Sequence, residues 1–321
     1  MLRTLVWLAF VLIFLLSPFI GAVNLDITKI VQGDSLSHTL FFELRLPRVL
    51  FAFLAGAILA LSGMLFQTLF RNPLMTPYTL GISSGAVLGA GIAIKLGLAT
   101  LFFGVASVSL FGFLGAFLTV LLLIYLSQFL HTAYNSSLLL LGIALSLFYT
   151  SALMIVFYLG SSIQNDMLIR FTMGSLSIIG WEHPILLGGV LFVLLGSILL
   201  YKYELQLMSI SDTSAQLKGV NTKNTTLLLL LVSSLAIGVL VSISGPIGFV
   251  GLIVPHMVLK LYPVTIEKRI LITALFGGFF LVFCDTLTRV LQTQSELPIG
   301  IVTALVGGPF FIYLIVKGSE K

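Results

Sequence analysis

Long apolar runs alternate with short polar segments along almost the whole chain. A helix needs roughly 17–25 apolar residues to cross a bilayer, and ten runs reach or nearly reach that length. They are 5–23, 49–70, 78–97, 101–126, 137–159, 184–201, 225–243, 247–262, 270–284 and 298–316. The eighth and ninth are short, which favours helices that are broken or packed inside a bundle over helices that face lipid. The pattern predicts an all-α polytopic membrane protein of about ten transmembrane helices, in a single domain that covers residues 1–321.

Composition supports this class and excludes others. The chain is 59% hydrophobic and 8% charged, against about 25% charged for a soluble domain. The net charge of +5 is spread singly through short loops, so we expect no nucleic-acid partner and take membrane lipid as the surroundings. The first run follows a single Arg3 and is longer than the roughly 7–15 residues of a signal-peptide core. We therefore expect residues 1–22 to be retained as part of a first span.

The basic residues orient the predicted spans. Ten spans place both termini on one side of the membrane. With that side cytoplasmic, the inner segments hold Arg3, Arg71, Lys202, Lys218, Lys223, Lys260, Lys268, Arg269, Lys317 and Lys321. The outer segments hold Lys29, Arg45, Arg48, Lys95, Arg170 and Arg289. Because cytoplasmic loops carry the excess of Lys and Arg, the bias favours cytoplasmic N- and C-termini.

Two glycine patterns interrupt the apolar runs. Gly81, Gly85 and Gly89 share one helix face, which predicts a close approach by a neighbouring helix. Between residues 244 and 257 the helix-weakening residues are Gly245, Pro246, Gly248, Gly251 and Pro255. Each internal Gly costs about 1 kcal/mol of helix propensity and each Pro about 3. This break serves either close backbone packing or a polar path across the bilayer, and we assign Gly245 and Pro246 to the turn into the eighth span.

The longest segment between spans, 202–224, predicts a short helix. Ser209 and Asp212 fit a capping box, with Ser211 as an alternative N-cap. Lys218 suits the C-terminal end of the helix dipole and Gly219 is a natural residue to follow the helix. Such a helix of about two turns is either a connector that lies on the membrane or a lever that another protein pushes.

Several kinds of chemistry are missing from the sequence. There is no G-x-x-x-x-G-K-[ST] motif for nucleotide phosphates and no H-E-x-x-H motif for zinc. The histidines (His38, His131, His183 and His256) fall in four separate segments, and the single Cys284 excludes an internal disulfide. We expect no cofactor, no metal and no catalytic residue, which disfavours a polytopic membrane enzyme.

Ionisable residues are also scarce within the spans. An ion-coupled secondary transporter usually places such residues there, and no Asp or Glu lies in the middle of a predicted span. Asp285 and Arg289 are four residues apart near the outer end of the ninth span, which indicates a surface ion pair. A secondary transporter is therefore the less favoured alternative.

The ordered motifs of the chain resemble the permease subunits of bacterial ATP-driven type II importers, the FecCD family. The likeness covers nearly the whole length. The motifs are Arg45-Leu46-Pro47-Arg48, Gly63 with Gln67, Arg71-Asn72-Pro73-Leu74, Leu80 to Ala86, Met173-Gly174-Ser175-Leu176 with Trp181, the element 245–256, and Leu297-Pro298-Ile299-Gly300. The chain is somewhat short for the family, and His131 to Tyr134 is less basic than usual there.

The resemblance implies a multi-pass protein of the bacterial inner membrane that works with partners. These are a second permease subunit (identical or a sister chain), two cytoplasmic ATP-binding subunits, and a periplasmic or lipid-anchored substrate-binding protein. The implied cargo is a ferric siderophore, with haem or cobalamin as alternatives. The fifth and tenth helices, 137–159 and 298–316, would line the pathway.

The resemblance also assigns roles to individual residues. The coupling helix that contacts the ATPase would be 211–219, with Ser211, Asp212, Ala215, Gln216, Lys218 and Gly219. Docking of the binding protein would fall to Arg45, Arg48 and Arg289 on the outer face, pairing with acidic residues of that partner.

Overall fold

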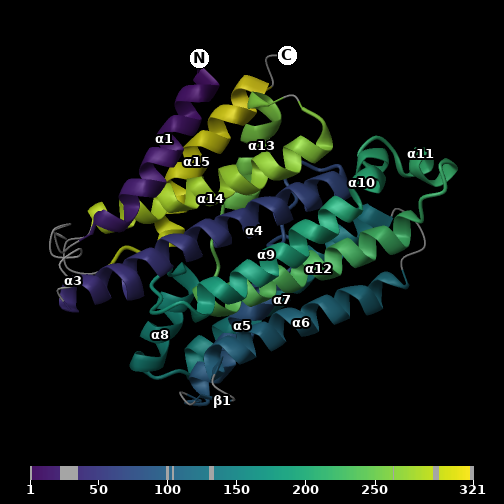
Figure 1. Cartoon of the computed structure of the whole chain (residues 1–321). Coiled ribbons are helices and arrows are strands. Elements are labelled where there is room, and N and C mark those ends of the chain that lie inside the picture. Colours follow the sequence, from purple (N-terminus) through teal and green to yellow (C-terminus); the bar gives the residue numbers. More distant parts are fainter. Residues whose placement is uncertain are drawn as a thin grey trace. The chain divides into compact units, whose positions relative to one another are not determined.

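The computed structural model describes residues 2–21, 35–98, 101–102, 105–129, 134–262, 264–291 and 296–318 (Figure 1). The helices of the first half are α1 (Leu2–Leu16), η1 (Ser17–Phe19), α3 (Ser35–Thr39), the π-helical η2 (Leu40–Arg45), α4 (Leu46–Phe70), α5 (Ile82–Lys95), α6 (Ser107–Ser127) and α7 (Tyr134–Leu159). Those of the second half are α8 (Ser162–Met173), α9 (Glu182–Leu200), α10 (Lys202–Met208), α11 (Asp212–Leu217), α12 (Thr222–Ser244), α13 (Val250–Leu261), α14 (Ile266–Val290) and α15 (Ile299–Gly318). One antiparallel pair of short strands, β1 (Leu101–Phe102) and β2 (Val105–Ala106), joins α5 to α6.

Each of the ten predicted spans contains one of these helices, so the all-α polytopic fold is confirmed. Six helices are long and apolar enough to cross a membrane by themselves, and α1, α5, α13 and α15 provide shorter apolar helices. The sequence suggested a short ninth span. This expectation is wrong, because α14 runs from Ile266 to Val290. Its additional turns contain charged residues at both ends, and the apolar pattern alone could not include them.

Four helices outside the predicted spans were missed: α3 and η2, which precede α4, and α8 and α10. α8 begins with a capping box in which the Ser161 side chain accepts from the backbone of Gln164 and the Gln164 side chain accepts from the backbone of Ser161. Most of its side chains are exposed and many are polar, so no apolar run marked it. α10 precedes the predicted helix in the segment 202–224 and ends at Met208.

The described residues form two compact units. Unit 1 comprises Met1–Leu61, Ser175–Phe192 and Ile247–Lys321, and unit 2 comprises Ser62–Gly174 and Val193–Pro246. The chain passes from one unit to the other within α4 and α9, and at the segments after Gly174 and Pro246.

In unit 1, α14 packs against α1 and α4. Aromatic rings fill the contact with α1: Phe10 meets Phe276 edge to face, with ring centroids 4.8 Å apart, a geometry that aromatic pairs prefer. On the α4 side the backbones approach closely at Gly56 and Gly277. A Cβ on Gly56 would lie 2.2 Å from the carbonyl oxygen of Gly277, so this crossing excludes any side chain at residue 56.

In unit 2, α5 and α6 cross at the glycine face that the sequence predicted. A Cβ on Gly89 would lie 2.1 Å from the carbonyl oxygen of Phe111, and one on Gly115 would lie 2.2 Å from that of Gly85. The Thr119 hydroxyl donates to the Gly115 carbonyl at 2.7 Å, which satisfies the hydroxyl in an apolar setting. Close helix approach through small residues is thus confirmed here.

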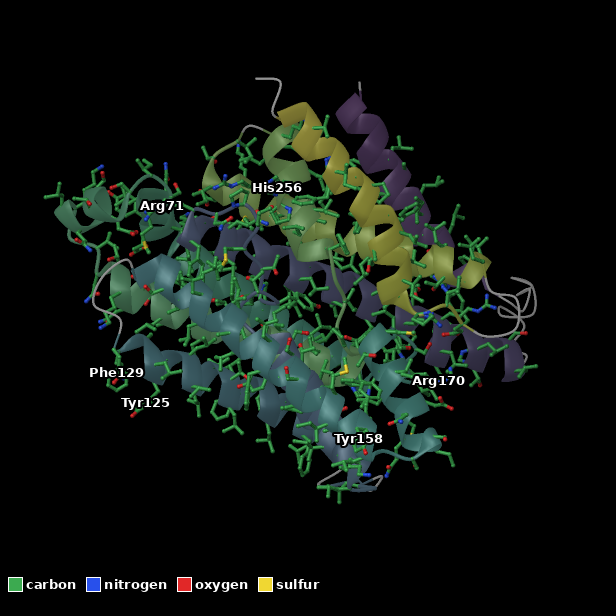
Figure 2. The ribbon with its side chains drawn as sticks, turned by 180° about the vertical axis from the view of Figure 1, so that it is seen from behind. Arg71, Tyr125, Phe129, Tyr158, Arg170 and His256 are labelled. Atoms are coloured by element: carbon green, nitrogen blue, oxygen red, sulfur yellow. The ribbon has the colours of Figure 1, made fainter. Side chains whose placement is uncertain are left out.

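Aromatic side chains mark the two ends of the unit 2 helices (Figure 2). Tyr125 and Phe129 are exposed at the end of α6, with their rings 5.4 Å apart. Tyr158 is exposed near the end of α7. Such residues concentrate at the boundary between hydrocarbon and water, so their positions are consistent with helices that cross a bilayer.

The glycine crossing of unit 1 gives a first prediction. Gly56→Ala should lower the free energy of unfolding by about 1–3 kcal/mol, because the added methyl group must separate two backbones. The matched control is Gly189→Ala in α9, where a Cβ would meet nothing within 4 Å and helix propensity should rise by about 1 kcal/mol. Thermal unfolding in detergent measures both, and an equal effect of the two substitutions would contradict the assignment.

Candidate functional site

The segment from Lys202 to Gly219, which we call the α10–α11 corner, contains the predicted coupling helix. Ser211 is the N-cap of α11, and its hydroxyl accepts from the backbone N–H of Ser214 at 3.1 Å. The capping box with Ser209 is wrong, because the Ser209 hydroxyl instead donates to the carbonyl of Gln206 at 2.7 Å, at the end of α10. The alternative N-cap, Ser211, is therefore the correct one.

The end of α11 is also as the sequence predicts. Gly219 has a φ of +85°, and its N–H donates to the carbonyl of Gln216 at 2.9 Å. The N–H of Val220 donates to the carbonyl of Ala215 at 3.1 Å. This pair of bonds is the Schellman motif, with Lys218 as the C-cap residue.

The predicted coupling residues differ in exposure. Ala215 is buried, and the Gln216 amide donates to the Thr222 hydroxyl at 3.0 Å, so these two attach α11 to its own unit. Ile210 and Leu217 flank α11 and are 72% and 84% exposed. Both side chains are accessible to a partner that contacts this corner. The sequence analysis did not single out either of them.

Arg71 is the functional candidate that the sequence could not place. It follows α4 directly, and its guanidinium binds both carboxylate oxygens of Asp212, at 3.0 Å and 2.6 Å. It also donates to the carbonyl of Met208 at 3.0 Å. Arg71 belongs to unit 2 and is labelled in Figure 2. In the sequence, Arg71 belongs to a motif of the resemblance and Asp212 to the predicted coupling helix. No sequence pattern pairs them, because they are 141 positions apart.

The predicted docking arginines belong to unit 1, where two of them join an ion network that is buried at Asp285 and exposed at Glu296. We call it the arginine cluster: Ser177, Arg48, Asp285, Arg289 and Glu296. Arg48 donates from Nε to Asp285 Oδ1 at 2.9 Å and from Nη1 to Glu296 Oε1 at 2.8 Å. Ser177 donates to the other carboxylate oxygen of Glu296.

Arg289 completes the cluster from the last turn of α14. Its Nε lies 3.1 Å from Asp285 Oδ2, and its Nη1 donates to the carbonyls of Ser17 and Ile20, each at 2.8 Å. Asp285 is fully buried and Arg289 is 6% exposed. The expectation of a surface ion pair is therefore wrong, because η1 and α4 cover both side chains.

Glu296 is the member of the cluster that lies between helices. Burial opposes its ionisation, but the hydrogen bond from Ser177 and the charge of Arg48 outweigh burial and hold the pKa of Glu296 below its usual range. The ionised carboxylate therefore contributes stability at neutral pH. That contribution is lost as the pH falls through the lowered pKa.

The three arginines differ in access. Arg45 is partly exposed and donates to the carbonyls of Phe19 and Pro18 at 3.1 Å and 3.4 Å. Arg48 has little exposed surface, and the guanidinium of Arg289 does not reach the surface of the described structure. For a direct ion pair with a partner, Arg45 is the accessible candidate, whereas Arg48 and Arg289 hold the local structure together.

The helix break at 244–257 is built on close packing. α12 ends at Ser244, and Gly245 follows with a φ of +67°. A Cβ on Gly245 would lie 2.1 Å from the carbonyl oxygen of Phe171, so a side chain does not fit there. Pro246 then leads away from the helix, which agrees with the predicted turn into the eighth span. Of the two explanations for the break, close backbone packing accounts for Gly245.

The other residues of the break belong to α13. Pro255 lies inside this helix and Gly251 is buried in its first turn. Phe249, its N-cap residue, has a φ of +67°, and a Cβ on Gly307 of α15 would lie 2.7 Å from the Cβ of Phe249. Gly248 has open space around it, so packing does not explain a glycine at that position.

Binding chemistry of other kinds is sparse in the described parts of the chain. In the described residues, no group of three or more His, Cys, Asp or Glu side chains could hold a metal ion. His256 lies against the carbonyl of Leu252 in its own helix, at 3.2 Å. His131 falls outside the described residues.

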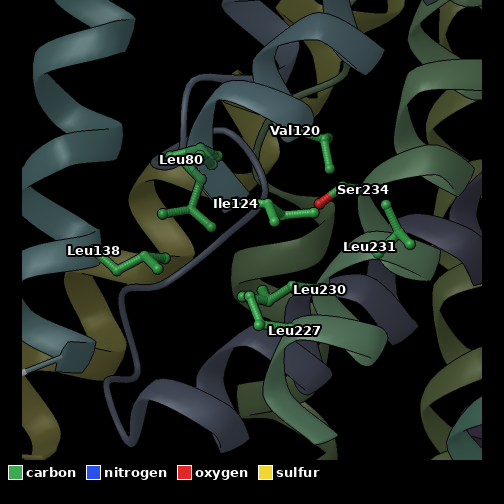
Figure 3. Close-up of a pocket in the computed structure, with 9 residues that line it drawn as sticks. Leu80, Val120, Ile124, Leu138, Leu227, Leu230, Leu231 and Ser234 are labelled. Atoms are coloured by element: carbon green, nitrogen blue, oxygen red, sulfur yellow. The ribbon is translucent and has the colours of Figure 1, made fainter. Parts of the chain in front are cut away.

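A small cavity in unit 2 is apolar except for one hydroxyl (Figure 3). It encloses about 20 Å³ between Leu80, Leu138, Leu230 and their neighbours, with the Ser234 side chain among them. This is close to the space of one water molecule, so the cavity cannot hold a transported chelate.

Among the described residues, six long apolar helices and four shorter ones define a polytopic membrane protein. The model of the FecCD transport family matches residues 9–317, and the chain belongs to this family. The chain is 34% identical to the hemin transport system permease protein HmuU of Yersinia pestis, over 98% of this chain and 96% of that protein. It is 35% identical to the vitamin B12 import system permease protein BtuC of Pectobacterium atrosepticum, over 88% and 84%.

A solved structure agrees with these relatives. An ABC transporter chain described as of metal-chelate type, in an inward-facing conformation, superposes with a TM-score of 0.86 at 30% identity, covering 97% of each chain. The protein is therefore a multi-pass permease of the ABC importer class. Its relatives are the permease subunits of such importers, a family that works with ATPase and substrate-binding partners.

The arginine cluster gives a second prediction. Asp285→Asn should lower the free energy of unfolding by about 3 kcal/mol, because it leaves buried arginines without their shared counter-charge. Asp166→Asn, on an exposed position of α8, is the matched control and should change stability little. Thermal unfolding of the purified permease measures both. Equal melting temperatures for the two variants would show that the cluster does not stabilise unit 1.

Proposed function

We propose that this chain is the transmembrane subunit through which an ABC importer carries a ferric siderophore across the bacterial inner membrane. The observation that carries the proposal is the family match over residues 9–317, together with a capped, exposed coupling segment at the α10–α11 corner. In this proposal the corner and both termini face the cytoplasm. One of two ATP-binding subunits contacts the corner. A second permease subunit, identical or a sister chain, completes the pathway, which the fifth and tenth spans line.

The choice of cargo rests on shared chemistry. Hemin, vitamin B12 and ferric siderophores are all bulky metal chelates, and two of the relatives are named for the transport of the first two. A chelate with an organic exterior can pass along an apolar, weakly binding corridor without a tight site in the membrane. The lack of a metal-binding cluster among the described residues fits a cargo that arrives with its metal already enclosed. Haem and cobalamin are the alternative cargoes.

The placement of the buried charged residues favours transport that is driven by a partner ATPase. The described ionisable residues buried in the spans, Asp285 and Arg289, are engaged with each other and with Ser17 and Arg48. They stabilise unit 1 and are poorly placed to carry a proton or sodium ion across the membrane. This observation favours an ATP-driven permease over the ion-coupled secondary transporter.

Reconstitution in proteoliposomes tests the proposal. Uptake should require ATP, the partner ATPase and the substrate-binding protein together, because the chain has no phosphate-binding motif of its own. Competition among ferric siderophore, haem and cobalamin for uptake identifies the cargo, and we expect the siderophore to be transported best. Uptake driven by a proton or sodium gradient through the permease alone would support the secondary transporter instead.

Docking of the binding protein gives a further prediction, through Arg45. Arg45→Glu should slow association of the binding protein severalfold at low salt and less at high salt, since a charge at the rim of an interface acts mainly on the association rate. Lys268→Glu at an exposed position of α14 is the matched charge reversal, predicted to lie on the opposite side of the membrane. Surface plasmon resonance on the assembled complex measures the rates. Identical association rates for both variants would remove Arg45 from the docking surface.

A further inference from the structure

We infer that Arg71 is a positioning residue that clamps the α10–α11 corner to the end of α4, so that movement of the corner reaches α4 directly. The inference deepens the proposed function, on which it rests, by assigning Asp212 an internal partner. Asp212, which the resemblance assigns to ATPase coupling, then acts through Arg71.

The geometry of the clamp is specific to arginine. The guanidinium presents two N–H groups to the two carboxylate oxygens of Asp212, at 3.0 Å and 2.6 Å. One of the same nitrogens also donates to the carbonyl of Met208 at 3.0 Å. Arg71 therefore binds the last residue of α10 and the first residue of α11 together. A lysine ammonium is a point charge and cannot reproduce this planar fork.

The helix ends favour the same contacts. Met208 is the last residue of α10, where carbonyl groups lack helical partners and the helix dipole attracts a cation. Asp212 lies in the first turn of α11, where a carboxylate is favoured. Arg71 thus binds both the negative C-terminal end of α10 and the acidic side chain in the first turn of α11.

The backbone of Arg71 indicates that this position is constrained. Arg71 has a φ of +46°, and it shares positive φ with one other non-glycine residue of the described chain, Phe249. Side chains other than Gly rarely adopt this conformation, and it persists where surrounding contacts fix it. The contacts that fix Arg71 are those to Asp212 and Met208. A glycine would adopt the same backbone without strain but could not bind the corner.

The clamp gives the corner a connection that its covalent neighbours do not provide. Most of α11 is exposed, and the side-chain bond between Gln216 and Thr222 spans six residues. Arg71 instead joins the corner to an element 137–141 residues away. A force that the ATPase applies to α11 therefore reaches α4 as well as α12, and α4 is a long span of the bundle.

A double-mutant cycle in the reconstituted importer tests this inference. Arg71→Gln and Asp212→Asn should each lower the substrate imported per ATP hydrolysed by about fivefold, at the lower end of typical coupling between sites. The double variant should be no worse than either single one, because the two residues act as one unit. Lys223→Gln, an exposed charge nearby on α12, should match the wild type. If the effects of the two substitutions multiply, or if Arg71→Gln transports normally, the clamp is wrong.

A second arm replaces the ion pair with a covalent tether. Arg71→Cys with Asp212→Cys should be uncoupled when reduced. It should regain coupling when a short bis-methanethiosulfonate bridges the two cysteines, each thiolate displacing one methanesulfinate. The native Cys284 is buried and should not compete for the reagent. A bridged protein that remains uncoupled would overturn the inference.

The proposed function and the clamp fail in different ways. Wild-type vesicles without ATP-dependent uptake would refute the importer itself. Ala215→Pro removes the backbone N–H that donates to the Ser211 carbonyl and should uncouple transport whether or not the clamp exists. If the Ala215→Pro variant is uncoupled while the Arg71→Gln variant couples normally, the role of α11 in coupling stands and the clamp is rejected.

Discussion

Polar groups within a bilayer must find their partners inside the protein, because hydrocarbon offers none. This constraint explains the features that set the chain apart from a plain apolar bundle. Arg289 and Asp285 are buried together, and the backbone carbonyls at the end of η1 take the remaining guanidinium donors. Thr119 donates to its own helix where α5 and α6 touch. In both places the polar side chain finds its partner within the protein.

The two candidate sites follow from the same constraint but have different consequences. In the arginine cluster, Asp285 and Arg289 are buried, Glu296 is exposed, and the ion pairs join several segments of unit 1, so the cluster acts as a structural joint. At the α10–α11 corner, charges lie near the surface and one ion pair connects two helix ends to α4. A pair that is half exposed can break and reform at little cost, which suits a part that must move when a partner binds and hydrolyses nucleotide.

Much of the architecture could be predicted from the sequence, and the part that could not has physical reasons. Apolar runs located all ten spans, and cap residues located α11 through Ser211 and Gly219. α8 was missed because an exposed, capped helix leaves no apolar run. The depth of Asp285 and the partner of Arg71 were missed because both depend on segments far apart in the chain. The resemblance groups Arg45, Arg48 and Arg289 as docking residues, and all three lie in unit 1, but burial separates Arg45 from the other two.

The bond from Arg289 to the carbonyl of Ser17 joins residues 272 positions apart, which affects how the polypeptide is made. When the first span has been synthesised, the guanidinium that binds the Ser17 and Ile20 carbonyls is missing until α14 is made. During that interval the nascent N-terminal span must keep this end near lipid head groups or the translocon. Its final depth is set late in biogenesis, when the ninth span arrives, and a chain truncated before α14 would expose an unfinished end to quality-control proteases.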